Sequence, residues 1–60
     1  MTFNVGDLVK YHNAYLDETR YGVVTATGTI GLQWVRIDFG DGESSMHFVE
    51  QYPNDIEKIG

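Results

Sequence analysis

Two histidines and nine acidic residues are the side chains in this 60-residue chain that could perform acid-base or metal chemistry. His12 and His47 could meet across strands, but two imidazoles without an arranged third ligand are more often ordinary surface residues. Residues 38–43 superficially resemble a calcium loop, yet they lack the ligand register that ends in a bidentate glutamate. We therefore expect no metal and no cofactor, and we interpret residues 38–43 as a hairpin turn.

Covalent and acid-base catalysis have little support in the sequence. It contains no cysteine, no phosphate-binding glycine loop and no Gly-x-Ser-x-Gly elbow. Paired carboxylates occur in any acidic chain, but so short a chain leaves little concave volume in which to desolvate a substrate and shift pKa values. The absence of cysteine also excludes disulfides as a source of stability. We expect that the protein is not an enzyme.

The charge distribution limits the classes of partner that the chain is expected to bind. Nine acids against four bases give a net charge of -5, and from Asp38 onward six acids face only Lys58. Duplex binding normally requires several Lys or Arg contacts to phosphates, and the four basic residues here are dispersed. We therefore expect no binding to nucleic acid by direct phosphate contact and no binding to an anionic membrane. The negative charge is compatible with a basic protein partner. The alternative is that the acidic residues serve only to keep the protein soluble.

Hydropathy and the first residues indicate where the protein acts. No run approaches 18 apolar residues, and the opening Met1-Thr2-Phe3-Asn4 lacks a basic region followed by an apolar stretch. This pattern predicts neither a membrane span nor a secretory signal. We expect a cytoplasmic protein.

Glycine and proline punctuation divides the chain into short segments with a period of two, which predicts strands and little helix. Residues 13–20 form the longest predicted loop, and Gly40-Asp41-Gly42 is the strongest hairpin signal. Pro53 cannot lie inside a sheet ladder, so residues 51–55 should form a turn or a single 3-10 turn. The predicted strands are residues 7–12, 21–27, 32–39, 44–49 and 56–59, with residues 28–31 as a hairpin connection.

Alternation within the predicted strands separates a core face from a solvent face. In the third strand, Val35, Ile37 and Phe39 share the face that we expect to be buried. The predicted core draws on the first four strands and contains Val9, Val23, Val35, Ile37 and Phe48.

The opposite face of the third strand carries the candidate partner-binding residues Leu32, Trp34 and Arg36. An exposed Trp-Arg pair is typical of an interaction hot spot. The alternative is that Trp34 caps an open end of the core, with Arg36 paired to Asp38 or to a cross-strand glutamate.

Three motifs follow one another along the chain: Phe3-x-Val5-Gly6-Asp7-Leu8-Val9-x-Tyr11, Gly22-Val23-Val24 and Val35-x-Ile37-x-Phe39-Gly40-Asp41-Gly42. As an ordered set they resemble the SH3-like barrel superfamily, in particular its Tudor-like and KOW-like members. The resemblance spans nearly the whole chain. It implies one all-β domain over residues 1–60, a small SH3-like five-stranded, partly open barrel with a short 3-10 turn before the last strand.

The resemblance also implies a candidate cation site, because Tudor-like domains form an aromatic cup for methylated ammonium groups. The matching positions are Tyr15 or Tyr21, then Phe39, with Asp41 as a charge partner. Arg36 departs from the pattern, since it places a fixed cation near a position where such cages often carry an aromatic. The alternative is that the aromatics fill the core and the remaining tyrosines are scattered over the surface.

A signalling-type SH3 domain would be expected to show a Pro-x-Asn-Tyr run. This chain has Tyr52-Pro53-Asn54-Asp55 and places Ile56 roughly where the anchoring tyrosine should fall. We therefore do not expect recognition of proline-rich peptides.

Two functions follow from the resemblance. The first is a small non-catalytic protein-interaction module that docks on a larger assembly, as in a viral or bacterial regulator of nucleic-acid machinery. The second is a structural accessory subunit of a redox complex, because small SH3-like barrels also resemble the peripheral subunit of photosystem I and the variable chain of ferredoxin-thioredoxin reductase. The sequence is also compatible with a homo-oligomer.

Overall fold

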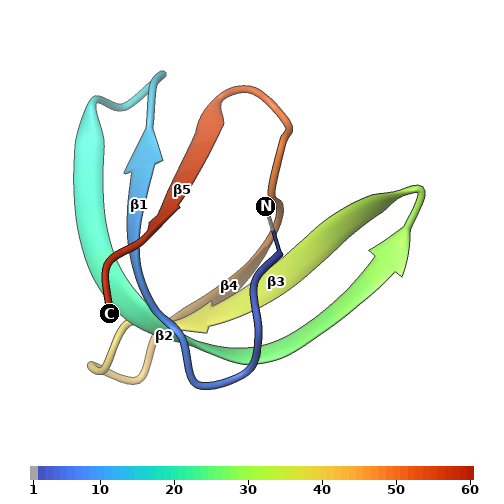
Figure 1. The fold of residues 1–60 in the computed structure, drawn as a ribbon. Coiled ribbons are helices and arrows are strands. Elements are labelled where there is room, and N and C mark those ends of the chain that lie inside the picture. Colours follow the sequence, from blue (N-terminus) through green and yellow to red (C-terminus); the bar gives the residue numbers. More distant parts are fainter. Residues whose placement is uncertain (1) are drawn as a thin grey trace.

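A computed structural model describes residues 2–60 and shows five antiparallel strands in one sheet (Figure 1). The described residues form no helix, so the prediction of an all-β chain is confirmed. In that part of the chain there is consequently no helix long and apolar enough to cross a membrane. The strands are β1 (Leu8–Asn13), β2 (Glu18–Ile30), β3 (Leu32–Asp38), β4 (Ser44–Phe48) and β5 (Asn54–Lys58).

The strand order is β4-β3-β2-β1-β5, so the chain forms a four-strand meander and then returns to place β5 beside β1. The sheet curls strongly but does not close, and β4 and β5 are its two edges (Figure 1). Its 13-residue strand β2 pairs with β1 through its first half and with β3 through its second half. A register shift between Val24 and Ala26 separates the halves. Such a bulge bends a strand, which lets β2 serve both parts of the curl.

The core lies on the inner face of the curl, where Phe39 and Val49 also pack against it. The predictions for Val9, Val35 and Ile37 are confirmed, because all three are fully buried. The predictions for Val23 and Phe48 are wrong, since both are only half-buried and lie outside the buried cluster. The buried residues are Phe3, Val9, Tyr11, Val24, Val35, Ile37 and Ile56.

Pairing with β1 decides which of the two adjacent valines of β2 is buried. Val9 lies opposite Gly22, so Gly22 and Val24 face the core and Val23 faces outward. A glycine is required at this position. A Cβ at Gly22 would lie 2.6 Å from the Ile37 Cγ2 and 2.6 Å from the Asp38 carbonyl oxygen.

The strand boundaries differ from the prediction mainly in β2, which extends past the predicted residues 21–27 at both ends. Residues 18–20 pair with β1 and residues 28–30 pair with β3, so the hairpin connection shrinks to Gly31. Gly31 has a φ of +74°, which favours glycine. Residues 52 and 53 form a turn, and β5 begins at Asn54, so this part of the described chain lacks the predicted 3-10 turn.

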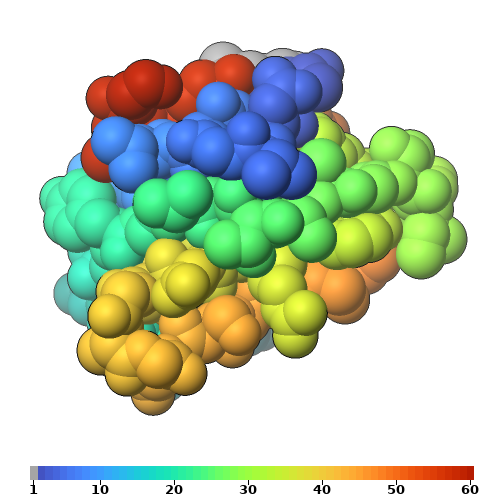
Figure 2. Space-filling view, turned by 90° about the horizontal axis from the view of Figure 1, so that it is seen from below, coloured from blue at the N-terminus to red at the C-terminus, as the bar shows by residue number. Residues whose placement is uncertain are grey.

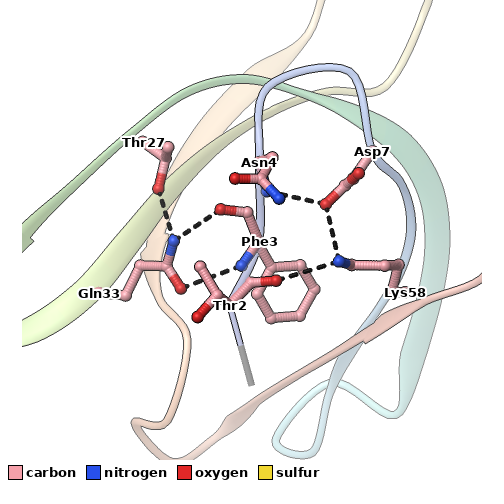
Figure 3. Close-up of polar contacts among 7 residues, drawn as sticks. All are labelled: Thr2, Phe3, Asn4, Asp7, Thr27, Gln33 and Lys58. Carbon is pink, nitrogen blue, oxygen red and sulfur yellow. Dashed lines mark hydrogen bonds and ion pairs between the residues drawn. The ribbon is translucent and has the colours of Figure 1, made fainter.

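An N-terminal arm, residues 2–6, packs Phe3 into the core (Figure 3). The Gln33 side chain holds the arm, since its Nε2 donates to the Phe3 carbonyl at 2.8 Å and its Oε1 accepts from the Phe3 N–H at 3.2 Å. The same Nε2 donates to the Thr27 hydroxyl at 3.0 Å. One amide therefore ties the arm to both β2 and β3.

Asp7 and Lys58 fix the other side of this arm (Figure 3). Lys58 Nζ lies 3.0 Å from the Thr2 carbonyl oxygen and 3.2 Å from Asp7 Oδ2. The Asn4 N–H donates to Asp7 Oδ2 at 2.8 Å. This hydrogen bond and the Lys58 ammonium hold the pKa of the Asp7 carboxyl below its ordinary value.

Candidate interaction surface

The outer face of β2, β3 and β4 carries the predicted partner-binding residues. In the observed register, Ile30 pairs with Leu32, Gly28 with Trp34, and Trp34 with Phe48. These strands form one continuous face in Figure 2, green to yellow to orange. We term its apolar side chains the outer patch: Ile30 (74% exposed), Leu32 (44%), Met46 (57%) and the half-buried Trp34 and Phe48.

Trp34 is held at the middle of the outer patch by its cross-strand neighbours. Its indole lies over Gly28, because a Cβ there would be 2.8 Å from three atoms of the ring. On its other side Trp34 lies opposite Phe48 of β4. The buried core cluster does not include Trp34, and Phe3 of the N-terminal arm fills that cluster instead. The indole is thus positioned on the outer surface before any partner arrives, which lowers the entropy cost of binding.

Arg36 lies on the same face as Trp34, opposite Met46. Its side chain is exposed, and the ion pairs among residues 2–60 do not include it. In the side-chain hydrogen bonds of the described residues, Arg36 takes part only through its backbone carbonyl, so the exposed guanidinium can donate to a carbonyl or carboxylate of a partner.

Of the predicted cage residues, Tyr21 and Phe39 lie together, and Asp41 comes close to Phe39 through a shared contact with Arg20. Tyr21 and Phe39 line one shallow hollow of about 380 Å³ together with residues of β1, β2 and the end of β3. Tyr15 lies elsewhere, in the turn after β1, where it packs edge-on against Tyr52 with ring centroids 5.4 Å apart. Both tyrosines of that pair are exposed.

A cation of the chain itself occupies the face of Phe39. The Arg20 guanidinium carbon lies 4.0 Å from the centroid of the Phe39 ring. Arg20 Nη2 is 2.6 Å from Glu43 Oε1 and 3.6 Å from Asp41 Oδ1. An aromatic face with two carboxylates is what an ammonium ligand would need, so such a ligand must first displace Arg20. The sequence analysis did not predict this role of Arg20. Alternation along β2 places Arg20 on the same face as Gly22, which was the one available signal.

The two histidines do not meet. His12 lies on β1, with Nδ1 2.9 Å from the Thr19 hydroxyl and Nε2 3.6 Å from Asp17 Oδ1. His47 lies on β4 opposite the buried Val35, so its ring faces inward, whereas His12 lies on the outward face of β1. Residues 2–60 bring no three His, Asp or Glu side chains together in a way that could hold a metal ion.

His47 packs on the inner face against the core. Its ring stacks on Tyr11 with centroids 4.3 Å apart, and its Nε2 lies 2.7 Å from the Ser45 hydroxyl. Burial lowers the pKa of His47 below its ordinary value of 6.5.

Acidification should therefore destabilise the fold through His47. Below pH 6.5 the unfolded chain takes up the proton before the folded one, so the free energy of unfolding falls as the pH drops from about 7.5 to about 5.5. Urea midpoints at the two pH values measure this. His47→Phe should reduce the difference, whereas His12→Gln should retain it. An equal drop in wild type and His47→Phe would assign the pH dependence to other groups.

Two of the four basic residues are engaged within the chain. Arg20 contacts Asp41 and Glu43, and Lys58 contacts Asp7. Lys10 lies opposite Glu57 of β5, on a different part of the sheet from Arg36. Within the described residues the four cations therefore do not line up along one face of the sheet.

Comparisons with known proteins provide no relative. No family model, no curated protein and no solved structure matches the chain.

Proposed function

We propose that the protein is a small SH3-like barrel that acts as a non-catalytic interaction module and docks a basic protein partner on the outer patch. The connectivity supports the first part: a four-strand meander whose fifth strand returns to β1, in a strongly curved sheet. The outer patch and the net charge support the second part.

The outer patch is the observation that carries the proposal. Scattered exposed apolar residues are normal, but a contiguous apolar group on the solvent face of a sheet marks an interaction surface. Ile30, Met46 and Leu32 are 74%, 57% and 44% exposed around Trp34. A positioned tryptophan beside a free arginine has the composition of a binding hot spot.

Charge supports a basic partner. The chain has a net charge of -5. Asp38 at the end of β3 and Glu50 after β4 flank the outer patch, and the ion pairs of the described chain include neither. Complementary charge accelerates association and favours basic over acidic partners.

Affinity capture with matched variants tests the proposal. We expect immobilised wild type to retain basic proteins from a cell lysate at low salt, and Leu32→Glu to lose them at least tenfold. Leu32 is exposed, so this substitution should leave the fold intact. Tyr52→Ala removes an exposed aromatic outside the outer patch and should bind as wild type does. Binding that is unaffected by Leu32→Glu, or equally lost in Tyr52→Ala, would contradict the proposal.

A further inference from the structure

The backbone of β4 offers unused hydrogen-bonding groups beside the outer patch. β4 is an edge strand, and the Val49 N–H donates to the Gln33 carbonyl at 2.9 Å. Hydrogen-bonded pairs alternate along an antiparallel ladder. The N–H and C=O groups of Ser44, Met46 and Phe48 therefore point away from β3, toward the open edge.

These groups have no other partner within residues 2–60. The backbone hydrogen bonds outside the ladders involve none of the three residues. The side-chain hydrogen bonds do not reach their backbone atoms either. At the open edge of β4, these three residues thus have unpaired backbone N–H and C=O groups, and their side chains lie on the outer face.

The two sheet edges differ in how they are protected. Proteins blunt exposed edges with charged side chains, proline or bulges. β5 carries Asp55 and Glu57 on its outer face. The sequence of β4, Ser-Ser-Met-His-Phe, contains no acidic residue, lysine, arginine or proline, and the pairing of β3 with β4 shows no register shift. The edge that adjoins the outer patch is the unprotected one.

We propose that an extended segment of the basic partner adds to β4 as a sixth strand, an inference that rests on the proposed function. Main-chain hydrogen bonds to Ser44, Met46 and Phe48 would supply affinity, and alternate side chains of the segment would extend the outer patch.

Charge at the ends of β4 specifies the segment. Asp41 and Glu43 precede the strand and share Arg20 as their one ion-pair partner, which leaves a net negative charge there, and Glu50 follows the strand. A five-residue strand spans about 17 Å, so a segment with alternating apolar residues and basic residues at both ends matches β4. A second copy fits poorly, because pairing β4 with itself brings like acidic ends together and opposes two chains of net charge -5.

The probe for this inference is the peptide Lys-Arg-Val-Thr-Val-Thr-Val-Lys-Arg, with a control in which glutamates replace the four basic residues. We expect the basic peptide to bind and the acidic control to bind at least tenfold more weakly. At saturation, amide hydrogen exchange at Ser44, Met46 and Phe48 should slow at least tenfold. The amides of Ser45 and His47, already bonded to β3, should change little.

Met46→Pro and Met46→Ala form a matched pair of variants. Both remove the thioether, but only proline removes the outward N–H and obstructs the edge, at a position where an edge strand tolerates it. We expect Met46→Pro to bind the peptide at least tenfold more weakly than Met46→Ala. If Met46→Pro does not fold, Ser44→Pro at the first position of β4 provides the same test.

The outcomes separate this inference from the proposed function. Capture that is lost in Leu32→Glu but equal in Met46→Pro and Met46→Ala would overturn strand addition and leave docking on the outer patch intact. Failure of the peptide to bind, equal binding of the acidic control, or unchanged exchange at Met46 and Phe48 would also overturn it. Slow exchange at these amides in a dimer without peptide would identify a second copy as the occupant and overturn the basic segment.

Discussion

Phe3→Ala is expected to lower the free energy of unfolding by about 3–5 kcal/mol, the usual cost of removing a buried phenylalanine. Phe3 is 1% exposed although it lies before the first strand. Its loss would leave a cavity in the core and remove the reason for the arm to dock. A domain this small has only a few kcal/mol of stability, so the variant should be largely unfolded at 25 °C.

Urea denaturation followed by circular dichroism measures this effect. Val5→Ala is the matched control, because Val5 belongs to the same arm but is 63% exposed. We expect that control to stay within about 0.5 kcal/mol of wild type. A Phe3→Ala variant within about 1 kcal/mol of wild type would mean that the arm is dispensable.

Trp34→Ala is expected to weaken partner binding by about 2 kcal/mol or more, roughly thirtyfold, with a smaller loss of stability than Phe3→Ala. Trp34 is half-buried on the outer face, where its indole lies over Gly28 and opposite Phe48, and it is not part of the buried core cluster. Its removal therefore leaves no internal cavity. Thermal melting and partner binding are measured on the same preparation.

Gly28→Ala provides a second variant that keeps the tryptophan. The new Cβ would lie 2.8 Å from the indole, so the ring must move from its place over β2. We expect binding to weaken while the fold is retained. A Trp34→Ala variant that melts many degrees lower but still binds its partner would make Trp34 a structural residue, and the docking site would lie elsewhere.

The features predicted best from the sequence are those that depend on a single strand, namely which side chains face inward and where the strand ends in a turn. Alternation along residues 32–39 placed Val35 and Ile37 inward and Leu32, Trp34 and Arg36 outward, and the structure shows this arrangement. Glycine at positive φ in Gly40 and Gly42 accompanies the predicted turn before β4. Local steric rules govern these features, so they can be derived without knowledge of the neighbouring strands.

Features that depend on pairing between strands were not predictable in this way. Val23 and Val24 have the same propensity, and only the register against Val9 selects Val24 for the core. Phe48 fits either face of β4 by pattern, but its pairing with Trp34 turns it outward. The candidate surface was therefore predicted through Leu32, Trp34 and Arg36, while its cross-strand members required the structure.

The predicted aromatic cage also depends on contacts between distant segments, which the sequence alone did not reveal. Tyr21 and Phe39 share a hollow, but the loop that carries Tyr15 places it against Tyr52. Arg20 reaches Phe39 and Glu43 across 19 and 23 residues of sequence. Such contacts arise from the curl of the sheet and have no signature in local spacing.

Chemical-shift mapping of the isotope-labelled protein against the partner obtained by affinity capture tests the docking surface most directly. We predict that the largest amide shifts fall on β3 and β4, at Leu32, Trp34, Arg36, Met46 and Phe48, and that Tyr15 and Tyr52 are unaffected. Shifts concentrated on Tyr15 and Tyr52, or on the hollow lined by Tyr21 and Phe39, with β3 and β4 unchanged, would contradict the account.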